Sequence, residues 1–235
     1  MNDTLMVIGE ALIDFIPTEQ GMALKDVCSF TKHCGGAPIN IAAATAKLGA
    51  HSKVLTQVGA DAFGDFILET LSLCQVDITA VKRTKQYPTA LAFVALDEKG
   101  NRDFTFYRDP CADLHLSAED ITATMFQDCG ILHFCSVDLV DSPMKQAHLK
   151  AIQLAKEQGA IISFDPNVRL PLWSSKEDCK NTILEFAPYA DILKISDAEL
   201  FFLTGQKDCE QVFTVFPDAT ITFLRIGTSD SFNIV

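Results

Sequence analysis

Short apolar runs and amphipathic stretches alternate along most of the chain. Apolar runs of strand length cover residues 5–16, 51–58, 130–135, 160–165, 190–195 and 219–226. Between them, residues 37–48, 61–71, 143–158 and about 175–186 carry apolar side chains at helical spacing. Strands that alternate with helices predict a parallel, doubly wound sheet with right-handed crossovers. The first run is expected to form one strand that continues from Leu5 to Ile16.

One pair of strands breaks this rhythm. Residues 89–97 and 102–107 read as strands joined by a turn at Glu98–Asn101, with no helix between them. Together with the irregular stretch from Gly21 to His33, they predict a small sheet attached to the main body. We expect one domain over residues 1–235, with lid strands from about 17–34 and 89–108.

A glycine pair precedes the first helix. Gly35 and Gly36 permit a tight turn and a close approach of backbone N–H groups to a ligand. Pro38 suits the first helical turn, Gly49 ends the helix, and the amide of Asn40 both donates and accepts hydrogen bonds. This arrangement favours a neutral ligand rich in hydroxyl groups, and the alternative is a plain turn.

Polar residues follow or interrupt the apolar runs at three places: Asp14, residues 165–169 and residues 194–199. Such positions are expected at the carboxyl edge of a parallel sheet, where ligands bind. Arg169 suits a planar anionic group such as a transferring phosphoryl. The alternatives are a turn capped by Asp165 and, for Glu199, a capping box with Ser196. His133, within an apolar strand, is expected to be a core residue.

Composition excludes several classes of protein. The net charge of −12 over 235 residues leaves no basic stripe for a nucleic-acid partner. The 8 cysteines form no CxxC pair, which is typical of small core residues in a reducing cytoplasm. The start of the chain does not read as a signal peptide, and no apolar run is long enough to span a membrane. Neither a GxxxxGK[ST] nor a GxGxxG motif is present.

The stretch Gly35-Gly36-Ala37-Pro38-Ile39-Asn40-Ile41-Ala42, with Gly49 and Gly59 behind it, is long and specific. On this stretch the chain resembles the ribokinase/PfkB family of carbohydrate kinases, and within it the bacterial fructokinases. Further segments that look like fructokinases extend the resemblance over nearly the whole chain: 9–14, 106–108, 164–169, Trp173, 194–199 and 203–205.

The resemblance implies an ATP-dependent sugar kinase that converts fructose to fructose 6-phosphate. Its fold would be a ribokinase-like three-layer αβα sandwich with a mostly parallel sheet and a small β-sheet lid. ATP and Mg²⁺ would be the cofactors, and the protein would be a cytoplasmic homodimer joined through the lid. Carried over by residue, the resemblance assigns the sugar to Asp14, Gly35, Gly36, Asn40, Phe104, Phe106, Arg108 and Arg169. Arg169 would also be catalytic, Lys194, Ser196 and Gly227 would bind the nucleotide, and Glu199 would hold the metal through water.

Two departures from the family pattern bear on activity. Arg225 stands where relatives commonly have Thr, two residues before Gly227. The second family signature, of the form Asp-Thr-x-Gly-Ala-Gly-Asp, supplies an anion site and the aspartate base, and it does not occur in these 235 residues. We therefore expect little kinase activity from this chain alone. The alternatives are a fructokinase represented by part of its chain, an inactive truncated remnant that binds sugar or dimerises only, and a kinase for 2-keto-3-deoxygluconate or ribose.

Overall fold

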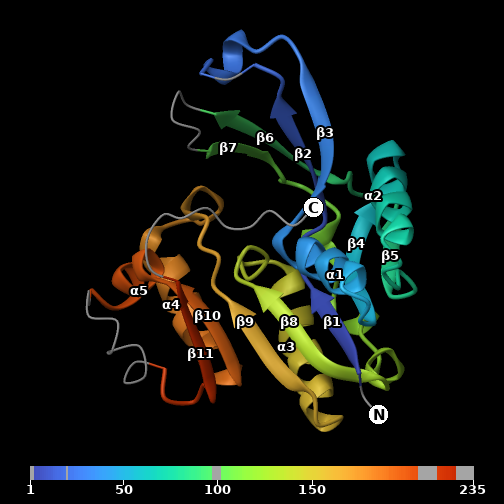
Figure 1. Ribbon diagram of the computed structural model, residues 1–235, viewed down its shortest axis with the longest axis vertical. Helices are drawn as coiled ribbons and strands as arrows, with labels where there is room; N and C mark the ends of the chain where they lie inside the picture. The colour runs from blue at the N-terminus through green and yellow to red at the C-terminus, as the bar shows by residue number, and fades with distance from the viewer. Residues whose placement is uncertain (1–2, 20, 97–101, 206–215, 226–235) are drawn as a thin grey trace.

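A computed structural model describes residues 3–19, 21–96, 102–205 and 216–225, which form two sheets and their flanking helices (Figure 1). The large sheet has the order β11-β10-β9-β8-β1-β4-β5, and its strands pair in parallel. Its strands are β1 (Thr4–Ile8), β4 (Ser52–Gly59), β5 (Val81–Thr84), β8 (Cys129–Cys135), β9 (Ile161–Asp165), β10 (Ile192–Ser196) and β11 (Ile221–Arg225). The parallel sheet expected from the alternating pattern is confirmed.

Helices cover both faces of the large sheet. Side chains on β1 alternate between two cores: Met6 and Ile8 pack in the cluster that α3, α4 and α5 share, while Val7 packs in the cluster of α1 and α2. The helices are α1 (Ala37–Lys47), α2 (Ala62–Leu73), α3 (Pro143–Glu157), α4 (Lys176–Phe186) and α5 (Asp197–Thr204). The short 3-10 helices are η1 (Leu24–Asp26), η2 (Asp113–His115), η3 (Ala118–Asp120), η4 (Ala123–Phe126), η5 (Leu170–Leu172) and η6 (Ala187–Tyr189). This is the predicted three-layer αβα sandwich.

A second sheet, the lid, stands above the carboxyl edge of the first (Figure 1). Its order is β3-β2-β6-β7, and β6 and β7 form the predicted antiparallel pair. Its strands are β2 (Leu12–Pro17), β3 (Phe30–Gly35), β6 (Ala90–Leu96) and β7 (Arg102–Tyr107). The lid therefore begins at Leu12, earlier than the predicted boundary near residue 17.

The prediction of one strand from Leu5 to Ile16 is wrong. Strand β1 ends at Ile8, and the chain turns at Gly9 before β2 begins in the other sheet. Gly9 has φ +146°, and a Cβ there would lie 2.7 Å from Cγ of Pro38, so the turn is pressed against helix α1. Asp14 consequently lies within a lid strand and not at the end of a large-sheet strand.

Several expected elements lie outside the described residues: the turn at 98–101, the short helix at 208–216 apart from Phe216, and a last strand at 228–235. Within the described part of the chain, none of the helices is long and apolar enough to cross a membrane. His133 is buried in β8, as predicted.

The connections of the large sheet reverse direction at β1. Strand β1 lies between β4 and β8, so the chain winds outward from it on both sides. The carboxyl ends of β1 and β8 point toward the lid (Figure 1). Such a switch point, where neighbouring connections leave on opposite faces, forms the crevice in which α/β proteins bind ligands.

Candidate functional site

The glycine pair connects the lid to the first helix. Gly35 ends β3, and Gly36 is the N-cap of α1 with φ +114°. A Cβ on Gly36 would lie 2.3 Å from the carbonyl oxygen of Glu10, and one on Gly35 would lie 2.2 Å from Oδ2 of Asp14. The structure thus brings the carboxylate of Asp14 against the backbone of Gly35, and only glycine leaves room for it.

Two more of the predicted sugar residues share this region. The N–H of Asn40 donates to the carbonyl of Gly36 at 3.0 Å, which places Asn40 in the first turn of α1. Asp14 pairs with Ala92 on β6, and Ala92 pairs with Phe106 on β7, so Asp14 and Phe106 lie on the same face of the lid. The same face would receive a ligand held above the switch point.

Phe104 and Phe106 both belong to β7. The backbone of Phe104 pairs with Val94, while Phe106 is half-buried. Phe106 and Arg108 help to line a cleft of about 950 Å³, which also contacts Val137 after β8 and Leu172 in η5. The cleft therefore runs between the edge of the lid and the loops of the large sheet.

Arg108 is not an open surface cation. It is 6% exposed, and its Nη2 donates to Oδ2 of Asp113 at 2.7 Å and to Oδ1 of Asp138 at 2.5 Å. Glu10 is buried, and its carboxyl group interacts electrostatically with Arg108. Direct contact of Arg108 with a sugar hydroxyl stays a prediction, and the geometry favours a supporting position behind the site.

The interpretation of the sequence did not single out Glu10, Asp113 or Asp138. A signal for two of them exists: Glu10 follows the apolar run of β1 and Asp138 follows that of β8. Charged residues just past buried strands lie at the carboxyl edge of a parallel sheet. The partner they share, Arg108, is distant in sequence, so the pattern gives no hint of the pairing.

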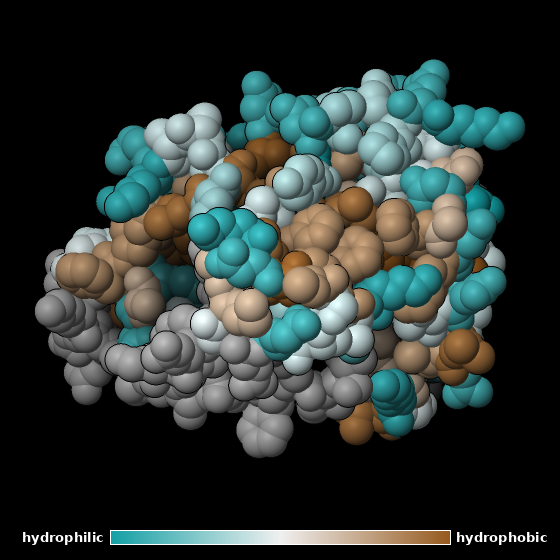
Figure 2. Space-filling model, turned by 90° about the horizontal axis from the view of Figure 1, so that it is seen from above, coloured by the Kyte–Doolittle hydropathy of each residue, from teal (hydrophilic) through white to brown (hydrophobic). Residues whose placement is uncertain are grey.

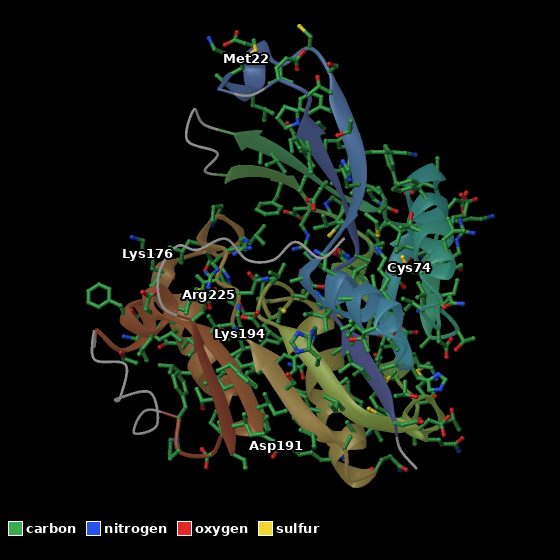
Figure 3. All side chains as sticks on the ribbon, in the orientation of Figure 1. Met22, Cys74, Lys176, Asp191, Lys194 and Arg225 are labelled. Atoms are coloured by element: carbon green, nitrogen blue, oxygen red, sulfur yellow. The ribbon has the colours of Figure 1, made fainter. Side chains whose placement is uncertain are left out.

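The segment after β9 holds a second charged group. Nζ of Lys194 donates to Oδ2 of Asp165 at 2.7 Å, and the N–H of Asn167 donates to Oδ1 at 3.1 Å. The turn capped by Asp165 is thus confirmed. Burial raises the pKa of Asp165, and the charge of Lys194 opposes that rise. Lys194 and Arg225 lie at the upper part of the large sheet toward the lid, and Asp191 lies at the opposite edge (Figure 3).

Glu199 links helix α5 to the loop that carries Arg169. Its Oε2 accepts from the N–H of Ser196 at 2.9 Å and from the Ser196 hydroxyl at 2.8 Å, which confirms the capping box. Its Oε1 accepts from the N–H of Val168 at 3.0 Å, and the carbonyl of Val168 accepts from Nη1 of Arg169 at 3.0 Å. Glu199 therefore fixes the backbone next to Arg169.

Glu199, predicted to hold the metal through water, has no free carboxylate oxygen for direct coordination. Both carboxylate oxygens of Glu199 already accept hydrogen bonds from the protein. In the described ranges, no group of three or more acidic, histidine or cysteine side chains is arranged to hold a metal ion. Glu199 fits a role through water and not as a direct ligand. Gly227, predicted to touch the nucleotide, lies outside the described residues.

Comparisons with known proteins agree on one family. Residues 2–220 match the profile of the pfkB family carbohydrate kinases. The chain is 42% identical over 222 residues to a probable fructokinase-2 of Arabidopsis thaliana, covering 93% of this chain and 68% of the relative. It is 38% identical over 226 residues to fructokinase-2 of Solanum lycopersicum, covering 95% and 69%. It also resembles the crystal structure of a fructokinase with bound ATP from Xylella fastidiosa, with TM-score 0.86 and 34% identity, over 96% of this chain and 69% of that one. The chain thus spans about two thirds of these relatives' length.

Proposed function

The chain belongs to the pfkB family of carbohydrate kinases, and from that premise we propose that it phosphorylates fructose with ATP, giving fructose 6-phosphate. The observation that carries the proposal is the contact between Asp14 on lid strand β2 and Gly35 at the end of lid strand β3. A carboxylate beside glycine backbone suits vicinal hydroxyls, because the carboxylate accepts hydrogen bonds and the backbone supplies further polar groups. The similarity to proteins named fructokinases supports fructose as the acceptor in this proposal.

In this proposal the sugar lies between the lid and the carboxyl edge of the large sheet. Asp14 and Asn40 bind hydroxyl groups of the sugar, and the backbone of Gly35 and Gly36 contacts its ring. Phe106, on the same lid face as Asp14, covers the ring and keeps water out. The backbone position of Phe104 on the same strand suits it to the same task.

Two cations at the sheet edge suit the transferring phosphoryl group. Arg169 follows β9, and Lys194 lies on the neighbouring strand β10 with its side chain 41% exposed. Bound ATP would supply the phosphoryl group, whose oxygens carry the charge that such cations stabilise. We propose that Arg169 contacts the sugar and the moving phosphoryl group and that Lys194 and Ser196 face the nucleotide. The part-buried hydrogen bond from the N–H of Val168 to Glu199 keeps the loop of Arg169 in place.

Mg²⁺ belongs to the same proposal. Because the oxygens of Glu199 are occupied by Ser196 and Val168, we assign Glu199 to the water shell of the ion. We also place the protein in the cytoplasm, since the described cysteines are free thiols, as expected in a reducing compartment.

We also propose a homodimer joined through the lid. The lid face opposite Asp14 carries Phe15, Phe30 and Phe93, whose ring centroids lie 4.9 to 6.4 Å apart, and Tyr107, which is 63% exposed. Figure 2, which looks onto this end of the molecule from above, shows apolar side chains with aromatic rings gathered there. Aromatic side chains of this kind are enriched in protein interfaces.

A kinase assay tests the function. Phosphoryl transfer from ATP is followed for fructose, ribose and 2-keto-3-deoxygluconate at equal concentrations, and fructose binding is measured in parallel by calorimetry. Because the second family signature does not occur in these 235 residues, phosphoryl transfer is expected to be slow, with fructose as the preferred acceptor. Fructose is expected to bind without ATP. Preference for another sugar, or no binding of fructose, would contradict the assignment.

A further inference from the structure

Four charged side chains meet in the interior where the lid joins the large sheet. They come from four segments: Glu10 after β1, Arg108 after β7, Asp113 in η2 and Asp138 after β8. They are 3%, 6%, 1% and 0% exposed. Since β1 and β8 are neighbours at the switch point, Glu10 and Asp138 follow strands whose carboxyl ends border the crevice assigned to the sugar.

Glu10 connects the cluster to the glycine loop. Its Oε1 accepts from the N–H of Ala37, the first residue of α1, at 2.7 Å. Gly36, the N-cap of α1, has no side chain with which to satisfy that N–H, so a carboxylate from another segment caps the helix. The negative charge of Glu10 also suits the positive end of the helix dipole.

Arg108 connects the same cluster to the end of lid strand β7. Its guanidinium bridges Asp113 and Asp138, which holds the exit of the lid against the loop after β8. Burial raises the pKa of Glu10 to about 7, and the charge of Arg108 and the hydrogen bond from Ala37 oppose that rise. Burial likewise raises the pKa of Asp138, against the charge of Arg108. One cation thus stabilises several buried carboxyl groups.

The charged cluster contains buried polar atoms that lack hydrogen bonds. Among the residues that the structure describes, three buried polar atoms of the cluster have no hydrogen-bond partner: Oε2 of Glu10, Nε of Arg108 and Oδ2 of Asp138. Each side chain therefore depends on the charge of its neighbours, because a buried charge without compensation is strongly unfavourable. Removal of one member is expected to displace the others and the two segments attached to them.

We propose that Glu10, Arg108 and Asp138 form a brace. The brace fixes the position of the glycine loop (Gly35 and Gly36) relative to the chain that leaves lid strand β7, so its members are positioning residues for the sugar. The proposal rests on the proposed function, because this position matters only if the sugar binds between these segments. Glu10 acts through Ala37 on the loop of Gly35 and Gly36. Arg108 acts through Asp138 on β7, the strand that carries Phe106.

Two substitutions of Glu10 separate positioning from bulk stability. Glu10→Gln keeps an oxygen that accepts from Ala37, whereas Glu10→Ala removes it. We expect Glu10→Ala to weaken fructose binding about 10-fold or more, as loss of a charged hydrogen bond allows, and to raise KM more than it lowers kcat. Glu10→Gln is expected to bind within about 3-fold of wild type, because the acceptor that caps Ala37 is retained.

A matched control is Glu185→Gln, which removes the charge of an exposed carboxylate on α4 that pairs with Lys145 at 2.9 Å. It is expected to leave fructose affinity unchanged. Equal fructose affinity in Glu10→Ala, Glu10→Gln and wild type would overturn the brace, even if both variants unfold more readily. If Glu10→Ala does not fold, Asp138→Asn replaces it, and there too unchanged affinity would overturn the proposal.

A readout without sugar separates failure of the brace from failure of the proposed function. Amide exchange at Ala37, followed by NMR, should accelerate about 10-fold or more in Glu10→Ala and little in Glu10→Gln, because exchange reports local opening. Wild-type protein that binds no sugar would refute the proposed function. Unchanged exchange at Ala37 would refute the brace whatever the sugar result.

Discussion

Gly35→Ala is expected to damage sugar binding without damaging the fold. Gly35 does not have a positive φ, so alanine fits the strand backbone. The new methyl group, however, would lie 2.2 Å from Oδ2 of Asp14 and 2.7 Å from its Cγ. The Asp14 carboxylate must therefore move away from the place where we propose that it accepts hydrogen bonds from the sugar.

The size of the effect follows from that overlap. Ordinary contact begins near 3.4 Å, so the carboxylate must withdraw by about 1.2 Å from its 2.2 Å position. A hydrogen bond to a charged group contributes about 1.5–3 kcal/mol, and a displacement of this size forfeits most of it. Because about 1.4 kcal/mol is tenfold in affinity, fructose binding should weaken roughly 10- to 100-fold.

The assay is calorimetric titration with fructose in a double-mutant cycle with Asp14→Ala. If Gly35→Ala acts through Asp14, it should cost little more in the Asp14→Ala background, so the two effects should not add. Gly159→Ala, just after α3, is the control for fructose affinity: a Cβ there meets nothing within 4 Å, and the strain that its φ of +75° imposes on alanine acts on stability and not on Asp14. Full additivity, or wild-type affinity in Gly35→Ala, would refute the role given to Asp14.

Three further predictions concern stability and assembly. Asp61→Ala should lower the free energy of unfolding by about 1–2 kcal/mol in urea titrations, because Asp61 caps α2 through Phe63 and Gly64, and a loss below about 0.5 kcal/mol would contradict this. Burial lowers the pKa of His148 in the folded protein from 6.5 to about 4. Between pH 6.5 and 4 the unfolded chain therefore binds a proton that the folded protein does not, and the free energy of unfolding should drop by up to ~1.4 kcal/mol per pH unit as the pH falls. His148→Gln should reduce this pH dependence of the free energy of unfolding, and an unchanged pH dependence in the variant would contradict the role of His148. Tyr107→Glu should shift the protein from dimer to monomer in sedimentation velocity, and a monomeric wild type would disprove the lid dimer.

The regular part of the fold could be predicted from the sequence, because strands of the large sheet are short apolar runs buried on both faces, while each helix buries one face. The capping box of Ser196 and Glu199 is local in sequence, and it too was predictable. The break after Ile8 was not, since the apolar run continues through it. What divides the run is a contact between Gly9 and Pro38, residues far apart in the chain.

In the candidate site, too, local contacts could be predicted from the sequence and long-range contacts could not. Gly35, Gly36 and Asn40 lie in one short motif, so their proximity follows from the sequence. The brace joins Glu10, Arg108 and Asp138 through pairings that only the tertiary structure creates. The motif around Arg108 suggested direct contact with the sugar, whereas the structure buries its guanidinium between two carboxylates.

A crystal structure of the protein with fructose tests the central claim most directly. The account predicts a sugar between the lid and the carboxyl edge of the large sheet, with its hydroxyls within about 2.5–3.2 Å of the Asp14 carboxylate and the Asn40 amide. It also predicts that the ring lies beneath Phe106. Fructose bound at another place, or with Asp14 turned away from it, would contradict the account.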